Sequence, residues 1–357
     1  MTPIIRPVSL ASLLVAALLA ACGARTGLLE PGKDRADAGG AGGSGGTSTG
    51  GTGAMGGTGA MGGTGGTSAS ACVPGEGPVE LAAGYVWPFG IAEWGGYVFF
   101  TLYDGTGALI RVSKTGGDAV AIVDGLDYPS AVAVDETGVY VASSGDGQIF
   151  RTDVDGDSIE VLASGQGGPS DLVLDDTHVT WTNYFGDQIR RMPKAGGSAV
   201  TLASTQSSPY RLAVGPTLVY WGEFVDGVWS VPKSGGDTVS LGDGEPRSFD
   251  VDDEWLYFTN PNTGGVHRMP LSGGPVEILY ESDRFSDGIA VDGTTVYVTF
   301  ASGEVIHLPK AGGEVELLAD EQAGPTHIVD DDGCVYWTNT GDGLPSIGNV
   351  MRAPKGL

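Results

Sequence analysis

Residues able to hold a ligand, most of them polar or charged, recur along this 357-residue chain at intervals of about forty residues. They occur in the pairs Phe89-Gly90, Ser130-Ala131, Ser170-Asp171, Tyr210-Arg211, Arg247-Ser248, Asp287-Gly288 and Thr326-His327. A histidine and two aspartates can serve as a base and metal ligands. A mixed polar and aromatic set can instead form a binding site. Either use requires a fold that brings the pairs together.

The sequence lacks the common catalytic motifs. It contains no H-E-x-x-H, no G-x-S-x-G and no thiol nucleophile. Of the four histidines, His178 falls at a turn, and His267 and His307 fall in strands predicted to lie away from the pairs. Only His327 belongs to a pair, so we predict no catalytic residue and no metal site.

The pairs open a unit that is clearest from Pro169 to Ser208. It contains four short β-rich runs bounded by Gly, Pro, Asn and Asp, which indicates strands. These runs are Asp171 to Leu174, Val179 to Thr182, Gln188 to Met192 and Ala199 to Ala203. Hairpin-length connections favour one antiparallel sheet. A sheet of this size cannot cover both its faces, so it must stack on neighbouring copies.

Seven copies of the unit run from about Trp87 to the C-terminus. Their first strands begin near Gly90, Ala131, Asp171, Arg211, Ser248, Gly288 and His327. A period of about forty residues with four strands is typical of propeller blades, of which a ring holds about four to eight. We therefore predict an all-β fold, a seven-bladed β-propeller of four-stranded antiparallel blades, over residues 74–357.

The last copy lacks a fourth strand, because the sequence ends at Leu357. The missing strand is found near the other end, where Val79 to Ala83 matches the fourth-strand residues Val315 to Ala319. We expect this N-terminal strand to complete the last blade and close the ring. Closure pairs strand edges that would otherwise invite aggregation.

The run AVDxxxVYWTN followed by GxIxRxPK resembles the YWTD and NHL classes of propeller, and more loosely the TolB-like envelope propellers. The resemblance covers about 270 residues. It implies the fold alone, since those classes share no single activity. The sevenfold repeat also loosely resembles virginiamycin B lyase. That resemblance implies a second interpretation, a metal-dependent lactonase or lyase with His327, Asp171 and Asp287 as base and metal ligands.

The first residues of the chain carry targeting signals. Residues 1–21 combine Arg6 with an apolar run from Leu10 to Ala21, which is shorter than a bilayer span of roughly twenty residues. The ending Leu19-Ala20-Ala21-Cys22 resembles the lipobox of bacterial lipoproteins. It implies a cleaved signal peptide and a Cys22 acylated with fatty acids such as palmitate. Gly23 implies outer-membrane retention. The alternative is an ordinary signal peptide in which Cys22 occurs by chance.

Residues 22–73 are rich in Gly, Thr and Ser, with GTGAMG repeated. Such a stretch carries too little apolar surface to fold. We interpret it as a disordered tether, with an adhesive repeat as the alternative.

Two cysteines remain once Cys22 is lipidated. Cys72 lies just before the closing strand, and Cys334 opens the second strand of the blade that this strand completes. In an oxidising envelope they are a natural disulfide pair. The alternative is two unpaired buried thiols.

The net charge of −26 lies almost entirely in the propeller region. Such a surface repels nucleic acid and anionic lipid headgroups. We therefore expect no nucleic-acid partner and contact with the membrane only through the lipid. Solubility explains the acidity, and binding of cations or basic partners is the alternative.

In propellers the first strands line the axis, and their starts share one face with the loops between second and third strands. We call this surface the axis mouth. The ligand-binding residues predicted there are Asp171, Tyr210, Arg211, Arg247, Ser248, Asp287, His327, Tyr184 and Phe224. The final blade adds a long loop from Thr340 to Asn349. The alternative is that these groups only pair with one another around a water-filled axis.

Other conspicuous residues have structural interpretations. The run Asp153-Val154-Asp155-Gly156-Asp157 looks like part of a calcium loop, but it occupies a turn where Asp and Gly are ordinary. We therefore predict no cofactor, with calcium as the alternative. Recurrent aspartates should cap turns: Asp135, Asp175, Asp252, Asp292 and Asp331. Second-strand tryptophans should pack between blades: Trp181, Trp221 and Trp337.

These observations predict a monomeric, lipid-anchored protein of the bacterial cell envelope. Its axis mouth binds an envelope protein, a peptide or a glycan and does not catalyse a reaction. The lactonase or lyase is the second interpretation, and a purely structural surface protein is the third.

Overall fold

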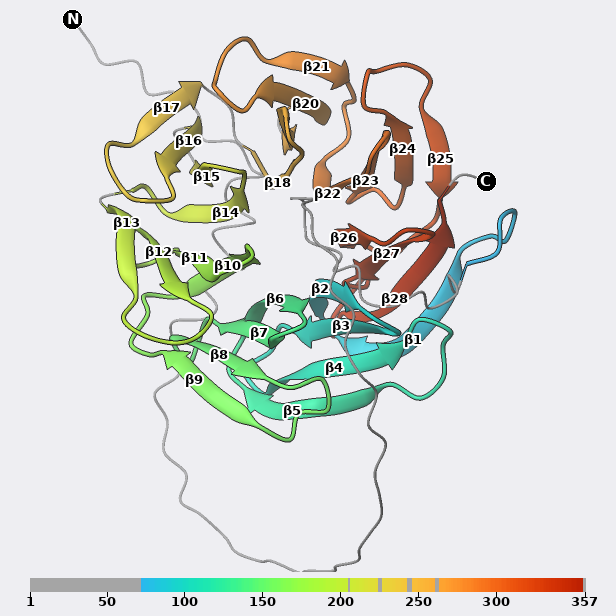
Figure 1. Ribbon diagram of the computed structural model, residues 1–357. Helices are drawn as coiled ribbons and strands as arrows, with labels where there is room; N and C mark the ends of the chain where they lie inside the picture. The colour runs from blue at the N-terminus through green and yellow to red at the C-terminus, as the bar shows by residue number, and fades with distance from the viewer. Residues whose placement is uncertain (1–71, 205, 224–226, 243–245, 261–262, 356–357) are drawn as a thin grey trace, which may run out of the picture. The chain divides into compact units, whose positions relative to one another are not determined.

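The computed structural model describes residues 72–204, 206–223, 227–242, 246–260 and 263–355. All regular secondary structure in these residues is β-strand, arranged in seven four-stranded antiparallel sheets. Figure 1 shows the sheets following one another around a ring. The predicted seven-bladed β-propeller is therefore confirmed. The predicted signal peptide, Cys22 and nearly all of the predicted tether lie outside the described residues.

Each of the first three blades is formed by four consecutive strands. They are β2 (Pro88–Trp94), β3 (Tyr97–Leu102), β4 (Gly107–Ser113) and β5 (Val120–Leu126) in blade 1; β6 (Pro129–Asp135), β7 (Gly138–Ser143), β8 (Gln148–Thr152) and β9 (Ile159–Ala163) in blade 2; and β10 (Pro169–Leu174), β11 (His178–Asn183), β12 (Gln188–Pro193) and β13 (Val200–Ser204) in blade 3.

The next three blades repeat this order. They are β14 (Pro209–Val214), β15 (Leu218–Glu223), β16 (Gly227–Pro232) and β17 (Val239–Gly242) in blade 4; β18 (Ser248–Val251), β19 (Trp255–Asn260), β20 (Gly265–Pro270) and β21 (Glu277–Tyr280) in blade 5; and β22 (Ser286–Val291), β23 (Thr295–Phe300), β24 (Val305–Pro309) and β25 (Glu316–Ala319) in blade 6.

Blade 7 joins the two ends of the described chain. Its strands are β26 (Pro325–Asp330), β27 (Cys334–Asn339), β28 (Ile347–Pro354) and β1 (Val79–Val86). β1 pairs antiparallel with β28, from Val79 opposite Arg352 to Val86 opposite Ile347. The predicted closure is confirmed, and the closing strand extends three residues beyond the predicted end at Ala83.

The predicted disulfide between Cys72 and Cys334 is also confirmed, with the two Cα atoms 5.7 Å apart. It joins residues 262 positions apart in the sequence. The bond ties the start of the closing segment to β27, the second strand of the same blade. Strand pairing and a covalent bond therefore both hold the ring shut at blade 7.

Six of the seven first strands begin two residues earlier than predicted, and five of these six begin at proline. Proline is tolerated as the first residue of a strand, where its missing N–H removes no ladder hydrogen bond. The prolines are Pro88, Pro129, Pro169, Pro209 and Pro325. The prediction was late because proline was taken as the end of the preceding turn.

The hydrophobic core lies between consecutive blades. One cluster, for example, combines Tyr140 of blade 2 with Leu172 and Trp181 of blade 3. The three second-strand tryptophans are fully buried, which confirms their predicted packing role: Trp181, Trp221 and Trp337. The first strands pack against one another in order around the ring, and β26 contacts β2.

Five of the seven junctions between blades carry an ion pair, which we call the latch. An aspartate at the end of a first strand pairs with the lysine that follows the third strand of the next blade. The pairs are Asp135–Lys194, Asp175–Lys233 at 3.2 Å, Asp252–Lys310 at 2.5 Å, Asp292–Lys355 at 3.1 Å and Asp331–Lys114 at 2.8 Å. Because first strands run from the axis mouth to the other side, the latch lies on the face opposite the mouth.

Apolar groups replace both latch partners at the remaining two junctions. Trp94 and Val154 occupy the two positions between blades 1 and 2 and pack in one hydrophobic cluster. Gly215 and Leu271 occupy them between blades 4 and 5. Neither replacement leaves a buried charge without its partner, an arrangement that is strongly destabilising.

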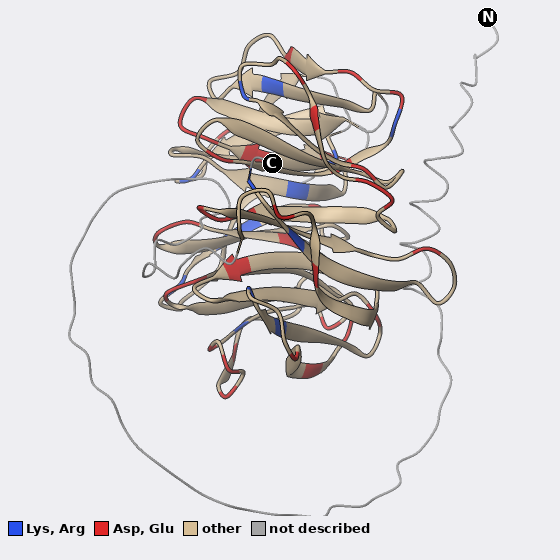
Figure 2. Cartoon of the chain, turned by 90° about the vertical axis from the view of Figure 1, so that its right-hand side faces the viewer, with Lys and Arg blue, Asp and Glu red and all other residues tan. Residues whose placement is uncertain are grey.

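The latch aspartates also accept hydrogen bonds from backbone amides of their own turns, which confirms the predicted capping. Asp331 accepts from the amides of Gly333 and Cys334 at 2.8 and 2.7 Å. Figure 2 shows the ring from the side, with acidic residues spread over turns and strands of many blades.

Candidate functional site

The predicted ligand residues occupy the starts of neighbouring first strands. Asp171 lies in β10, Tyr210 and Arg211 in β14, Ser248 in β18, Asp287 in β22 and His327 in β26, and Arg247 directly precedes β18. These strands adjoin in that order around the axis. Tyr184 follows β11, and its ring lies 6.3 Å from that of Tyr210. Phe224 lies outside the described residues.

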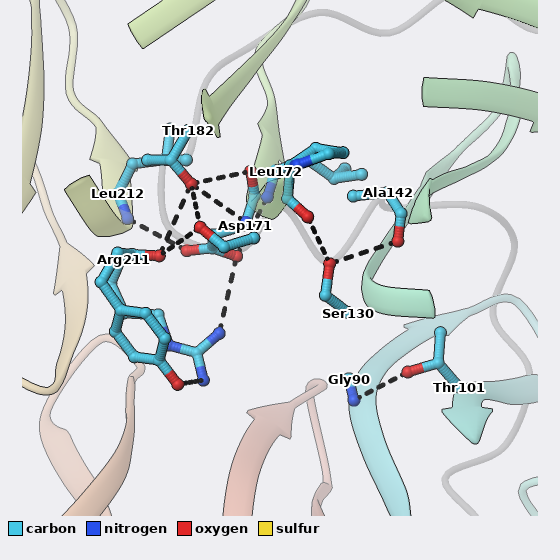
Figure 3. Close-up of polar contacts among 12 residues, drawn as sticks. Gly90, Thr101, Ser130, Ala142, Asp171, Leu172, Thr182, Arg211 and Leu212 are labelled. Carbon is cyan, nitrogen blue, oxygen red and sulfur yellow. Dashed lines mark hydrogen bonds and ion pairs between the residues drawn. The ribbon is translucent and has the colours of Figure 1, made fainter. Parts of the chain in front are cut away.

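Hydrogen bonds between blades hold the first strands at the axis. Hydroxyl groups donate to backbone carbonyls of the next blade: Ser130 to Pro169 at 2.8 Å, Thr259 to Asp287 at 2.8 Å, Thr299 to Thr326 at 2.6 Å and Thr338 to Phe89 at 2.8 Å. Figure 3 shows Ser130 in this role, beside the network around Thr182 and Asp171. The site is therefore supported by strands, not by loops alone.

Two arginines flank the ring of Tyr210. The guanidinium carbon of Arg211 lies 4.6 Å from the ring centroid and that of Arg247 lies 5.3 Å from it. Arg211 also lies 5.7 Å from the centroid of Phe89. Cations at such distances are attracted to the faces of aromatic rings. The rings therefore hold both guanidinium groups at the axis.

The carboxylate of Asp171 has structural partners. It accepts hydrogen bonds from the amides of Leu172 and Leu212, both at 3.0 Å, and so ties β10 to β14. Arg211 Nη1 lies 3.9 Å from its Oδ1 (Figure 3). Burial raises the pKa of Asp171, and Arg211 and the two amides oppose that rise. An aspartate bound in this way joins blades and is poorly placed to act as a base.

Asp287 and Arg247 form a second pair at the axis. Arg247 Nε donates to Asp287 Oδ1 at 3.0 Å. Burial disfavours the charged guanidinium, but the neighbouring Asp287 outweighs it and raises the pKa of Arg247. Among the described residues, the two terminal nitrogens of Arg247 have no hydrogen-bond partner. This arginine therefore keeps donors for a ligand.

His327 is the least satisfied polar side chain at the axis. Both of its ring nitrogens are shielded from solvent and have no hydrogen-bond partner among the described residues. Its ring meets that of Phe89 edge to face, with centroids 4.4 Å apart. Burial, together with Arg211 and Arg247, lowers the pKa of His327 well below its usual value. The imidazole is thus neutral at pH 7, with one donor and one acceptor unused.

A group of aromatic rings that was not predicted from the sequence adjoins His327. We call Trp87, Phe89, Tyr103 and Tyr128 the ring platform. Their rings form a connected series, with centroids 6.4 Å apart for Trp87 and Tyr103, 5.0 Å for Phe89 and Tyr103, and 5.2 Å for Tyr103 and Tyr128. All four are only partly buried.

Two members of the ring platform have an unfavourable backbone conformation. Trp87 and Tyr128, each just before a first-strand proline, have φ of 48° and 51°. In blades 3 and 7 the same position is Gly168 or Gly324, with φ of 64° and 66°. A non-glycine residue in this region costs of order 1 kcal/mol or more, and such residues cluster at functional sites. The presence of Trp87 and Tyr128 at positions where two other blades have glycine was the feature of the sequence that could have indicated the ring platform.

The axis residues do not fit a divalent metal ion. Within the described ranges, no group of three or more His, Cys, Asp and Glu side chains could hold one. Asp171 and Asp287 are paired with arginines, and the charges of Arg211 and Arg247 reach His327. Metal sites need deprotonated ligands and tolerate adjacent cations poorly.

The other candidates from the sequence lie away from the axis. His178 Nδ1 contacts the hydroxyl of Thr177 at 2.7 Å on the latch face. His267 stacks on Phe258 with centroids 5.4 Å apart, and His307 lies 3.7 Å from Glu316. The described chain contains no helix long and apolar enough to cross a membrane.

The run from Asp153 to Asp157 forms the turn between β8 and β9. Asp153 Oδ1 accepts from the amides of Asp155 and Asp157, and its Oδ2 accepts from the hydroxyl of Ser158. Asp155 pairs with Arg111 of the neighbouring blade at 2.5 Å. These contacts are those of an ordinary acidic turn.

No family model and no curated protein matches this sequence. Solved structures with a similar fold include a streptogramin B lyase, with a TM-score of 0.63 and 14% identity over 78% of this chain and 97% of that one. Virginiamycin B lyase from Staphylococcus aureus has a TM-score of 0.61 and 15% identity over 76% of this chain and 97% of that one. A chain of a nidogen/laminin complex has a TM-score of 0.52 and 18% identity over 66% of this chain and 98% of that one.

At these identities the similarity shows the shared β-propeller fold. The neighbours include lyases and a protein of a binding complex. The shared fold therefore does not distinguish catalysis from binding.

Proposed function

We propose that this protein is a non-catalytic binding module, whose axis mouth recognises a protein, peptide or glycan. We further propose that it acts as a monomer in the bacterial cell envelope, held at the outer membrane by a lipid on Cys22. The lipobox-like sequence and the Gly-rich stretch that follows it support the anchoring part of the proposal.

The state of His327 carries the binding proposal. A buried polar group without a hydrogen bond costs about 1–3 kcal/mol, and within the described ranges both nitrogens of this imidazole are unpaired. Arg247 adds two terminal nitrogens that have no partner in the described part of the chain, and the ring platform adds partly exposed aromatic surface. Unpaired donors beside aromatic rings are the features of a small-ligand or anchor-residue site.

A lactonase or lyase is the second candidate, and the neutral imidazole of His327 favours it, since a neutral histidine can accept a proton. The two carboxylates that such chemistry would use already bind other groups of the protein. Asp171 is bonded to two amides, and Asp287 is bonded to Arg247. The geometry therefore supports binding better than catalysis.

The test uses the full chain, solubilised in detergent, to capture ligands from an envelope extract. Recovery by wild type is compared with that by His327→Ala/Arg247→Gln, and Arg268→Gln at the outer side of blade 5 is the control. We expect the double variant to lose the captured ligand and the control to retain it. Equal recovery by all three proteins would exclude the axis mouth as the site. Turnover abolished by His327→Ala would favour the lyase.

A further inference from the structure

We propose that the ligand of the axis mouth is an acidic saccharide, a sugar chain with carboxylate groups. This inference rests on the proposed function and specifies the ligand class. The sugar ring stacks on the ring platform, and its carboxylate binds the arginines on the opposite side of the axis.

The ring platform is suited to a flat, partly apolar body. A sugar ring presents C–H groups on its faces and hydroxyl groups at its edge. The faces of aromatic rings carry negative charge density and attract such C–H groups. Trp87 and Tyr103 are stacked with an interplanar angle of 2°, and both are partly exposed.

The backbone at the ring platform indicates that its rings serve a purpose beyond packing. Glycine meets the requirement for positive φ at the same position in blades 3 and 7 without strain, and Ser208 occupies it in blade 4 with φ of 55°. Trp87 and Tyr128 have a strained backbone at this position, and their rings remain partly exposed instead of filling the core. Strain that yields exposed aromatic surface at a mouth is evidence for a ligand that contacts it.

The arginines are suited to a carboxylate. Arg247 uses only Nε toward Asp287, which leaves both terminal nitrogens without a partner among the described residues. A guanidinium binds carboxylate through two parallel N–H groups. The unpaired imidazole of His327 lies beside the same charges and can donate to or accept from a sugar hydroxyl.

The distances connect the ring platform to the arginines without a gap. Tyr103 lies 5.0 Å from Phe89, and Arg211 lies 5.7 Å from Phe89. Arg211 then lies 4.6 Å and Arg247 5.3 Å from Tyr210. A short oligosaccharide can therefore contact both parts at once.

A peptide is the less favoured occupant of the axis. Peptides commonly bind by adding a strand to a free sheet edge. At the axis, backbone groups of the first strands already bond to neighbouring blades, as Leu212 N does to Asp171 and Val291 N to Asp250. Recognition there must use side chains, and those available are rings, guanidinium groups and one imidazole.

The test is calorimetric titration of the full chain with trigalacturonate, a probe that carries both a sugar ring and carboxylates. Its methyl ester keeps the rings without the charge, and acetate and inorganic phosphate carry charge without rings. We expect the acid to bind, the ester to bind at least tenfold more weakly, and acetate and phosphate not to bind. Equal binding of acid and ester, or tighter binding of an acidic peptide, would overturn the proposal.

Two variants separate the parts of the site. Arg247→Gln is expected to weaken binding of the acid by about 10- to 100-fold and to leave the ester unchanged, since a charge-assisted hydrogen bond is lost. Trp87→Gly keeps the backbone conformation seen at Gly168 and is expected to weaken acid and ester equally. Arg268→Gln, distant from the axis, serves as the control.

The outcomes distinguish the two proposals. If the envelope extract yields a ligand that depends on His327 and Arg247, but no acidic sugar binds, the ligand class is wrong and the binding module stands. If Arg247→Gln and Trp87→Gly bind the acid as wild type does, the axis mouth is not its site, and the saccharide proposal is overturned.

Discussion

Breaking one latch while leaving its partner in place should destabilise the ring more than removing both partners. Asp135 and Lys194 pair at the junction of blades 2 and 3, and their side chains are only 8% and 7% exposed. Lys194→Leu leaves Asp135 buried and unpaired. Asp135→Gly/Lys194→Leu instead reproduces the uncharged junction that this chain has at Gly215 and Leu271.

The magnitude follows from the burial of the pair. Removing one partner of a buried ion pair costs about 3–5 kcal/mol, whereas replacing both by apolar groups is often nearly neutral. Asp135 also accepts a hydrogen bond from the amide of Thr137 at 2.8 Å, so the double variant loses about 1 kcal/mol for that bond. We expect the single variant to lose about 3–5 kcal/mol and the double variant about 1–2 kcal/mol.

The assay is urea unfolding at pH 7, with the midpoint and slope fitted for wild type and the single and double variants. Glu277→Gln is the control, because Glu277 pairs with Arg268 but is 47% exposed and such pairs contribute about 0–1 kcal/mol. The account would be refuted if the double variant were no more stable than Lys194→Leu. The unpaired charge of Asp135 would then not be the cause of the stability lost in the single variant.

Three further predictions concern ring closure and pH. Cys72→Ala/Cys334→Ala should lower stability by on the order of 5 kcal/mol in the chain-entropy model for a 262-residue separation, and intact mass should rise by two hydrogens when the wild-type bond is reduced. Burial opposes ionisation of Asp292 and Asp331, but the amides that they cap and the lysines beside them outweigh it and lower both pKa values from 3.8. At low pH the unfolded chain therefore binds more protons than the folded chain. The stabilisation that the two aspartates contribute is complete above about pH 5 and is lost as the pH falls below about 4. Urea midpoints that stay constant from pH 6 to 3.5 would contradict this. The pKa of His327 is lowered from 6.5, so the unfolded chain again takes up the extra proton and stability falls as pH drops below 6.5. His327→Leu should flatten that part of the profile, and an unchanged slope would show that the imidazole is not buried in solution.

Much of the fold could be predicted because its determinants are local and repeated. Alternating β-rich runs and Gly-rich turns recur in each copy, and the match of Val79 to Ala83 with Val315 to Ala319 predicted the closure. The cysteine pair followed from the same alignment. The first strands were predicted to begin two residues too late in six blades, in five of them because prolines such as Pro169 were interpreted as turn residues and not as strand residues.

The latch was missed because each partner is an ordinary turn residue within its own copy. Asp175 was correctly predicted to cap its turn, but its partner Lys233 belongs to the next blade. The pairing becomes visible only when copies are compared in order. Where Asp is absent, at Trp94 or Gly215, the lysine of the following copy is absent too.

The candidate site was predicted in position but not in chemistry. Repeat spacing placed His327, Arg211 and Asp171 at the axis. Spacing could not show that Asp171 is bonded to the amides of Leu172 and Leu212, or that both nitrogens of His327 lack a partner among the residues that the structure describes. These states depend on neighbouring blades. The ring platform was missed because Trp87 and Tyr128 stand at turn positions that blades 3 and 7 fill with glycine and blade 4 fills with Ser208.

The most direct measurement of the central claim is a crystal structure of the protein with the ligand captured from the envelope. The account predicts ligand atoms within hydrogen-bonding distance of the His327 imidazole and the terminal nitrogens of Arg247, with the ring platform in contact. A ligand bound at the outer rim or on the latch face, with these groups untouched, would contradict it.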